Sequence, residues 1–102
     1  MNKNSTDSKT CPSQTAFCRV TIINNRGLHA RAAARFASTT GNFNADVQVT
    51  RNEQTVSGLS ILGLMMLAAT PGCEIDLSAT GPDAKIALDA LSELVNDKFQ
   101  ED

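Results

Sequence analysis

The 102-residue chain lacks tryptophan and tyrosine, contains a single histidine, and carries a formal net charge of only −2. That charge gives no basic field for nucleic acid, and no strand interleaves aromatic and basic residues as an RNA-binding sheet requires. No apolar run approaches the roughly 18 residues of a membrane-spanning helix. These absences argue against nucleic-acid binding and membrane insertion, and they leave a soluble domain of ordinary hydrophobic content.

Cysteine is too scarce and too scattered to organise a site. Cys11, Cys18 and Cys73 are an odd number with no close pair and no histidine at metal-ligand spacing, so neither a disulfide framework nor a zinc site is expected. The chain also has no glycine-rich nucleotide loop, acidic metal cluster or carboxylate pair. We therefore expect reduced thiols, no metal and no cofactor.

The first residues differ in composition from the rest. Residues 1–16 are mostly polar and lack the apolar stretch of a signal peptide. We predict a disordered polar tail over residues 1–16, a single domain over residues 17–102, and a cytoplasmic protein. A chain of this length can form one compact core but not two.

Seven segments alternate between the two-residue period of strands and the 3.6-residue period of helices. They lie at 18–23 (strand), 30–39 (helix), 45–50 and 55–57 (strands of a hairpin), 60–67 (short helix), 75–79 (strand) and 82–95 (helix). The order is βαββαβα. Three helices on one face of a four-stranded antiparallel sheet would bury the apolar stripes, so the predicted fold class is α+β, an open-faced β-sandwich.

The packing faces of the two longer helices can also be predicted. The first helix, which Gly41 ends, is expected to face the sheet with four small residues: Ala30, Ala33, Ala34 and Ala37. The last helix is expected to begin with Pro82 at its first position and Asp83 in its first turn. Its wide apolar stripe comprises Ala84, Ala87, Leu88, Leu91, Leu94 and Val95.

The one histidine lies where the first strand gives way to the first helix, in the segment Gly27-Leu28-His29-Ala30-Arg31. An imidazole is mostly uncharged near neutral pH, so one ring nitrogen has a lone pair for attack on phosphorus. The unpaired N–H groups and positive dipole end of the helix form a seat for an anion, and Arg31 adds a permanent cation. His29 is therefore a candidate phosphoryl acceptor, although a lone histidine also suits an ordinary surface role.

These residues resemble the active-site segment of the HPr family, the histidine phosphocarrier proteins of the bacterial phosphoenolpyruvate-dependent phosphotransferase system. The family pattern is Gly-Leu-His-Ala-Arg-Pro-Ala, which residues 27–31 and Ala33 match, whereas Ala32 replaces the proline. Two further segments are similar to the family's regulatory-serine segment and to the strand and turn before its last helix: residues 56–67 and 71–81. The resemblance extends over about residues 17–99 and implies the same open-faced sandwich.

The resemblance implies a carrier function. His29 accepts a phosphoryl group on Nδ1 from phosphorylated enzyme I and donates it to an enzyme IIA domain, in sugar uptake and its regulation. The N–H groups of Ala30 and Arg31 hold the phosphoryl oxygens and the Arg31 side chain stabilises their charge, unless Arg31 is an ordinary exposed arginine. The protein is then a stoichiometric transfer intermediate, not an enzyme, and is expected to be a monomer. Ala32 makes the helix start less rigid than proline does but remains compatible with it, so we expect phosphocarrier competence to survive.

Ser60 is expected to cap the short helix that follows it, because a serine oxygen accepts a hydrogen bond from a free N–H of the first turn. The resemblance adds a second role, a regulatory phosphorylation site for an HPr kinase/phosphorylase. Phosphate there would place up to two negative charges in the partner surface and repel an acidic enzyme I or enzyme IIA site. The cap alone would also account for this serine.

The short helix carries more apolar side chains than one buried stripe on two turns needs, since Leu64 and Leu67 suffice for its core face. The surplus is predicted to be exposed as a partner surface: Leu59, Ile61, Leu62, Met65 and Met66. Such a patch suits a carrier that docks several partners weakly. The alternative is a helix that is deeply packed, or buried by dimerisation.

Two other functional classes stay open. One is a regulatory HPr-like protein of a nitrogen-related phosphotransferase branch, which acts by phosphorylation-dependent binding to regulators. The other is a small-ligand-binding α/β sandwich without phosphoryl chemistry, which no motif in the chain supports.

Overall fold

Two layers, a four-stranded sheet and three α-helices, make up the part of the chain that the computed structural model describes, residues 14–101. The elements are β2 (Thr15–Thr21), α2 (Ala30–Thr40), β3 (Asp46–Arg51), β4 (Gln54–Ser57), α3 (Ile61–Met66), β5 (Glu74–Thr80), α4 (Ala84–Asn96) and the short turn η1 (Lys98–Gln100).

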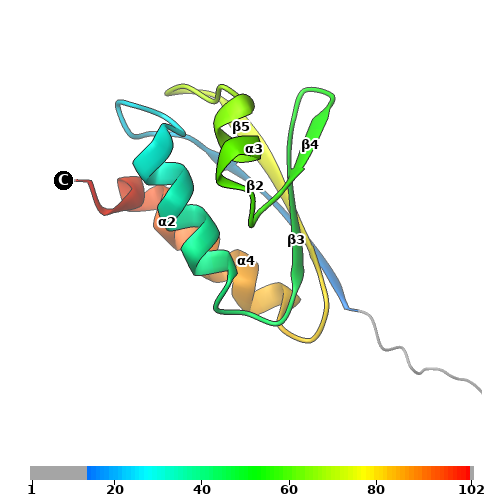
Figure 1. The fold of residues 1–102 in the computed structure, drawn as a ribbon. Helices are drawn as coiled ribbons and strands as arrows, with labels where there is room; N and C mark the ends of the chain where they lie inside the picture. Colours follow the sequence, from blue (N-terminus) through cyan, green and yellow to red (C-terminus); the bar gives the residue numbers. More distant parts are fainter. Residues whose placement is uncertain (1–13, 102) are drawn as a thin grey trace, which may run out of the picture.

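The strands lie in the order β2-β5-β3-β4, and every neighbouring pair is antiparallel. Figure 1 shows the helices on one face of this sheet, which leaves the other face open. The predicted α+β class, the open-faced sandwich and the order βαββαβα are therefore confirmed. None of the helices within residues 14–101 is long and apolar enough to cross a membrane.

The core lies between the inner face of the sheet and the helices. On the two central strands, Val47, Val49, Ile75 and Leu77 point inward and are at most 2% exposed. The predicted apolar stripe of α4 is confirmed, because all six of its residues are buried. Each large side chain that is fully buried contributes roughly 1.5–3 kcal/mol, so this interface supplies most of the stability that positions the helices.

The first strand corrects the predicted boundary between the tail and the domain. β2 begins at Thr15, and both Thr15 and Ala16 pair with β5, although residues 1–16 were expected to be tail. Pairing with a neighbouring strand satisfies their backbone groups whatever their polarity, so composition alone misplaces this boundary. The remainder of the tail prediction, residues 1–13, lies outside the described residues.

The predicted buried face of α2 is confirmed only in part, because Ala33 and Ala37 are buried but the other two predicted residues are not. Ala32 and Ala33 are completely buried with Phe36, whereas Ala30 is exposed and Ala34 is only half-buried. Phe36 is the largest apolar side chain of this helix, and its burial fixes which residues one turn earlier face the core. The prediction therefore included two alanines at the edge of the buried face and omitted Ala32, which lies within it. The predicted end at Gly41 is confirmed, because its N–H bonds to Ala37 O and Thr39 O.

The start of α4 also corrects an expectation. The helix begins at Ala84 with Asp83 as its N-cap residue, so Pro82 lies in the preceding turn and not at the first helical position. The Asp83 carboxylate accepts a hydrogen bond from Asn44 N at 2.7 Å instead of capping its own helix. A tertiary contact has thus replaced the local cap that the sequence suggests.

The loop between β2 and α2 is fixed by a close backbone approach. Leu28 N donates to Ala69 O at 3.0 Å, and Gly27 adopts φ +64° beside the same carbonyl. A Cβ atom added at Gly27 would stand 2.1 Å from Ala69 O. Only glycine fits this position without moving the backbone, and the next two residues deliver His29 to the start of α2.

Gly27→Ala should therefore reduce the free energy of unfolding by more than the roughly 1–2 kcal/mol that a left-handed alanine alone costs, because its Cβ would also overlap Ala69 O. Gly72→Ala is the matched control, since Gly72 also has a positive φ, +91°, but nothing lies within 4 Å of its added Cβ. Urea unfolding of both variants measures the difference. Equal losses would show that the Ala69 contact does not constrain this loop.

Candidate functional site

His29 is the N-cap residue of α2. Its backbone is extended, with φ −75° and ψ −179°, and its ring Nδ1 accepts a hydrogen bond from Arg31 N at 3.3 Å. The imidazole thus occupies the place that a serine or aspartate oxygen takes in an ordinary N-cap. Because Nδ1 accepts here, its lone pair points at the positive end of the helix.

The other ring nitrogen faces a carboxylate. His29 Nε2 pairs with Glu101 Oε2, so the hydrogen-bond network assigns the proton to Nε2 and leaves Nδ1 unprotonated. The His29 side chain is 22% exposed and that of Glu101 14% exposed. The ring is therefore held from two sides and remains accessible on its Nδ1 edge.

Glu101 is itself held in place by a buried amide. Asn24, only 1% exposed, donates from Nδ2 to Glu101 Oε1 at 3.1 Å and to Gly27 O at 2.9 Å. Burial raises the pKa of the Glu101 carboxyl. Hydrogen bonds from His29 and Asn24, with electrostatic contributions from the His29 ring and from Arg26, together outweigh burial and lower this pKa below its ordinary value. Glu101 is thus held as a carboxylate against the imidazole.

A left-handed turn brings Glu101 to this position. Lys98, Phe99 and Gln100 have φ values of 55°, 56° and 63°, a conformation that non-glycine residues rarely adopt in succession. Phe99 is fully buried and Gln100 Oε1 accepts from Arg35 Nη1 at 2.9 Å, and these two contacts hold the turn against its backbone strain. No pattern in the sequence predicts Glu101 as a site residue, because it lies 72 residues from His29 and no spacing rule connects them.

Arg31 borders a hollow beside the imidazole. The hollow has a volume of about 280 Å³ and is lined by Asn25, Arg26, Arg31 and Glu101. Arg31 and Ala30, the two residues whose N–H groups were expected to hold phosphoryl oxygens, are both exposed in the first turn of α2. The Arg31 N–H is directed at Nδ1, so any group bonded to Nδ1 meets this donor first.

The structure places Ser60 at the start of α3. Its Oγ accepts a hydrogen bond from Gly63 N at 3.0 Å, which confirms the predicted N-cap. The Ser60 side chain is half-buried, and α3 packs beside α2, the helix that carries His29. The two predicted functional segments are therefore neighbours in the fold.

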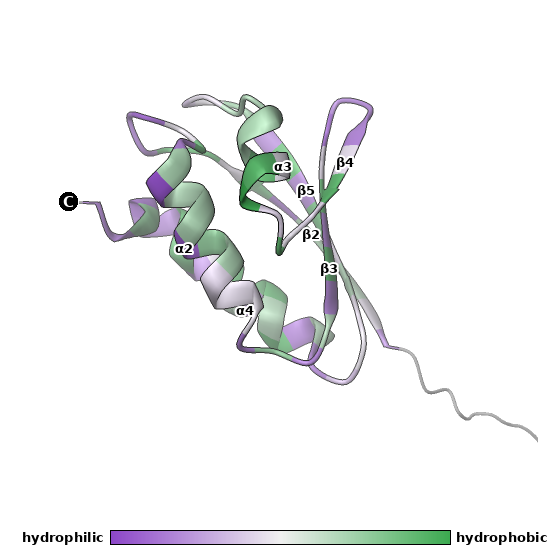
Figure 2. Cartoon of the chain, viewed as in Figure 1, coloured by the Kyte–Doolittle hydropathy of each residue, from purple (hydrophilic) through white to green (hydrophobic). Residues whose placement is uncertain are grey.

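The surplus apolar residues of α3 are exposed, as predicted. Leu64 and Leu67 are at most 1% exposed and form its core face, whereas five others range from 39% to 69% exposed: Leu59, Ile61, Leu62, Met65 and Met66. We call these five residues the α3 patch. Figure 2 shows the strong hydrophobic colouring along α3, on the helical side of the sheet. The chain thus exposes an apolar surface beside the histidine helix.

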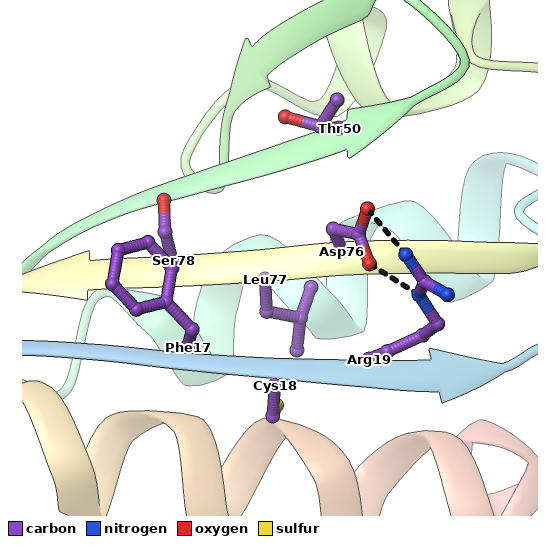
Figure 3. A pocket seen from close by; sticks show the side chains of 7 residues that line it. All are labelled: Phe17, Cys18, Arg19, Thr50, Asp76, Leu77 and Ser78. Carbon is purple, nitrogen blue, oxygen red and sulfur yellow. Dashed lines mark hydrogen bonds and ion pairs between the residues drawn. The ribbon is translucent and has the colours of Figure 1, made fainter.

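A larger hollow, of about 550 Å³, lies away from the histidine on the open face of the sheet. Figure 3 shows the side chains that line it, among them Phe17 of β2 and the pair Arg19–Asp76. Arg19 Nε donates to Asp76 Oδ1 at 2.7 Å, and this contact raises the pKa of Arg19 and lowers that of Asp76. The two charges of this pair neutralise each other, so among the residues that line this hollow no charged side chain is left unpaired to hold a phosphoryl group.

Comparison with known proteins agrees with the geometry around His29. The family model described as "PTS HPr component phosphorylation site" matches residues 18–97. Phosphocarrier protein HPr of Neisseria meningitidis is 48% identical over 82 residues, which cover 80% of this chain and 92% of that protein. Phosphocarrier protein NPr of Shewanella violacea is 45% identical over 83 residues, which cover 81% of this chain and 91% of that protein.

The solved structures agree. The crystal structure of HPr-C-His from Thermoanaerobacter tengcongensis matches with a TM-score of 0.81 at 37% identity, covering 85% of this chain and 98% of that chain. Sequence and fold thus both match HPr-type proteins over most of the chain. This chain belongs to the HPr family of phosphocarrier proteins of the phosphotransferase system.

Proposed function

We propose that this chain accepts a phosphoryl group on His29 Nδ1 from phosphorylated enzyme I and passes it to an enzyme IIA domain. The observation that carries the proposal is the orientation of the ring. Nδ1 lies at the N-terminus of α2 against Arg31 N–H, while Nε2 is bonded to Glu101. One ring nitrogen is thereby free for bonding to phosphorus beside donors that suit an anion.

The transfer needs no general base on this chain. The Nδ1 lone pair attacks phosphorus, the bond from phosphorus to the donor histidine nitrogen of enzyme I breaks, and the electron pair of that bond stays with enzyme I. The His29 proton remains on Nε2, hydrogen-bonded to Glu101. In-line positioning and charge stabilisation are then the main requirements.

The first turn of α2 supplies the charge stabilisation. Once phosphorus occupies Nδ1, the Arg31 N–H can turn from the ring nitrogen to a phosphoryl oxygen. The Ala30 N–H and the Arg31 guanidinium are the further donors for a group that carries about two negative charges. Because these donors exist before transfer, little reorganisation accompanies it.

Glu101 acts in this proposal as a positioning residue. Its carboxylate fixes the Nε2–H form of the ring and stabilises the positive charge that the imidazole acquires when Nδ1 bonds to phosphorus. It touches the far nitrogen and not the reacting one. Its effect is therefore on ring orientation and charge, not on bond making.

The alanine at position 32 is compatible with this role. The first hydrogen bond of α2 joins Ala33 N to His29 O at 2.8 Å, so the N–H of Ala32 precedes the helical ladder. A proline at this position would remove no hydrogen bond of the helix. Alanine in its place gives up only the fixed φ of proline. Ala32 is fully buried, and its small side chain keeps α2 close to the core.

The α3 patch is the proposed docking surface for enzyme I and enzyme IIA, with the protein acting as a monomer. It lies on the helix that packs beside α2, and its two methionines can adapt to more than one partner. A carrier must leave each partner quickly, which favours a small apolar contact over a large obligate interface.

A nitrogen-related branch is the second candidate, in which phosphorylated or unphosphorylated protein binds regulators. It is favoured by the 45% identity to the NPr of Shewanella violacea, close to the 48% identity to the HPr of Neisseria meningitidis. The two branches differ in the enzyme IIA domain that receives the group. Presenting the phosphorylated protein with each class of enzyme IIA separates them.

Incubation with enzyme I and phosphoenolpyruvate should label the protein with an acid-labile, base-stable phosphate, as expected of phosphohistidine. His29→Ala should remove the label completely, because the chain has no second histidine. Ser60→Ala is the control and should retain it. Absence of label from the wild type would overturn the carrier function.

Glu101→Gln keeps a hydrogen-bond acceptor for Nε2–H but removes the charge. The folded-state pKa of Glu101 lies below its ordinary value of 4.5, so its stabilisation is present above that pH and is lost as pH falls through the folded pKa. The variant should be about 1 kcal/mol less stable than wild type at pH 7, and the gap should narrow toward pH 3. Urea unfolding across this range measures it.

The matched control for that measurement is Glu93→Gln, on the exposed face of α4. The free energy of unfolding of this variant should stay close to that of wild type at every pH, since surface substitutions of this kind change stability little. If the stability difference between Glu101→Gln and wild type does not depend on pH, the proposed contact between the Glu101 carboxylate and His29 is contradicted.

We also propose Ser60 as the site of an HPr kinase/phosphorylase. With that kinase and ATP, the wild type and Ser57→Ala should be labelled and Ser60→Ala should not. Ser57 is a fair control because it lies three residues away and its Oγ also accepts a backbone hydrogen bond, from Leu59 N. Equal labelling of Ser60→Ala would refute this assignment.

A further inference from the structure

A second arginine borders the hollow beside His29. Arg26 immediately precedes Gly27 in the loop that leads to α2, and it lines the hollow of about 280 Å³ with Arg31, Asn25 and Glu101. Both arginines are exposed, and no carboxylate among residues 14–101 lies within 4.0 Å of either guanidinium. Two cations from two different elements thus face one space.

The charge balance of this space changes when His29 carries phosphate. Glu101 already contributes one negative charge, held as a carboxylate against the ring. A phosphoryl group adds about two more within a few ångströms. Arg31 contributes one positive charge and the helix end about half a unit. Together they do not balance the negative charge of the phosphoryl group and Glu101. A further cation is needed for the phosphoryl group and Glu101 to remain neighbours.

Arg26 already acts electrostatically on this site, since its charge is among the influences that lower the pKa of Glu101. It stands on the loop side of the hollow, whereas Arg31 stands on the helix side. Arginine in this place offers several donors to an oxyanion from a direction that the helix does not supply.

From this arrangement we propose that Arg26 is a second phosphoryl-binding cation, which holds the group on His29 from the loop side and offsets its repulsion by Glu101. The proposal rests on the proposed function of His29. Arg26, in the loop before the histidine motif, then helps to stabilise the phosphorylated form.

The loop does not need the Arg26 side chain for its own conformation. Its shape is set by the bond from Leu28 N to Ala69 O, by the bond from Asn24 Nδ2 to Gly27 O, and by the bond from Gly27 N to Asn24 O. Substitutions of exposed Arg26 should therefore leave the fold intact, and their effects can be assigned to charge.

The test compares Arg26→Leu and Arg26→Lys with wild type and with Lys85→Leu. Lys85 is an equally charged, exposed residue in the first turn of α4, about 20 Å along that helix from η1. All four proteins are phosphorylated on His29 with phosphoramidate, and the phosphoryl group is titrated by ³¹P NMR. The phosphoryl-exchange equilibrium with enzyme I is measured separately.

For Arg26→Leu we expect the phosphoryl titration to move to higher pH, because a lost cation destabilises the dianion. The exchange equilibrium should shift toward the unphosphorylated protein by roughly two- to fivefold, as for a partly exposed ion pair, and the shift should shrink at 1 M salt. Arg26→Lys should retain most of the wild-type behaviour, and Lys85→Leu all of it.

If phosphorylated wild type forms but Arg26→Leu titrates and exchanges like Lys85→Leu, the role of Arg26 is overturned and the carrier function stands. If enzyme I and phosphoenolpyruvate do not label wild-type His29, the proposed function itself fails. A loss in Arg26→Leu that salt does not alter would also overturn the electrostatic role.

Discussion

The approach of the loop before α2 to the carbonyl of Ala69 is the constraint on which the rest of the site depends. Leu28 N bonds to this carbonyl and Gly27 leaves no room for a side chain beside it. Because the loop cannot shift, α2 begins at a fixed residue, and the residue before it must serve as the cap. His29 fills that position, so the direction of its ring follows from backbone packing and not from a contact with any ligand.

The two nitrogens of His29 are then bonded to different parts of the chain. The helix start holds Nδ1, and the C-terminal turn brings a carboxylate to Nε2 at the cost of three consecutive left-handed residues. Strain of this kind persists only where the surroundings determine the conformation, as the burial of Phe99 does here. A carrier benefits from a partly open site of this kind, since exposed cations bind a phosphoryl group weakly enough to release it.

The proposed docking surface and the proposed phosphorylation site lie on one short helix. Ser60 caps α3, and Leu59 and Ile61 of the α3 patch flank that cap, so phosphate on Ser60 would lie beside the apolar surface that we propose for docking. The helix end itself tolerates the phosphate, because free N–H groups and the dipole favour an anion there. The same charge opposes the burial of the patch against a partner, since it would have to be desolvated. Phosphate on Ser60 would thus favour the start of α3 but weaken the binding of partners.

Short-range patterns in the sequence were sufficient for the order of elements, the caps at Gly41 and Ser60, the position of His29 at a helix start and the exposure of the α3 patch. Each of these depends on residues within one or two turns of each other, where hydrogen bonds and hydrophobic periodicity act locally. The buried face of α2 and the start of α4 depended instead on Phe36 and on the bond between Asp83 and Asn44, which are tertiary contacts. Glu101 became a site residue only because folding brought the C-terminal turn to the imidazole, and no local pattern encodes which distant groups will meet. Arg26 is close to His29 in the sequence, but the loop that carries it to the hollow takes its shape from the contact of Gly27 and Leu28 with Ala69.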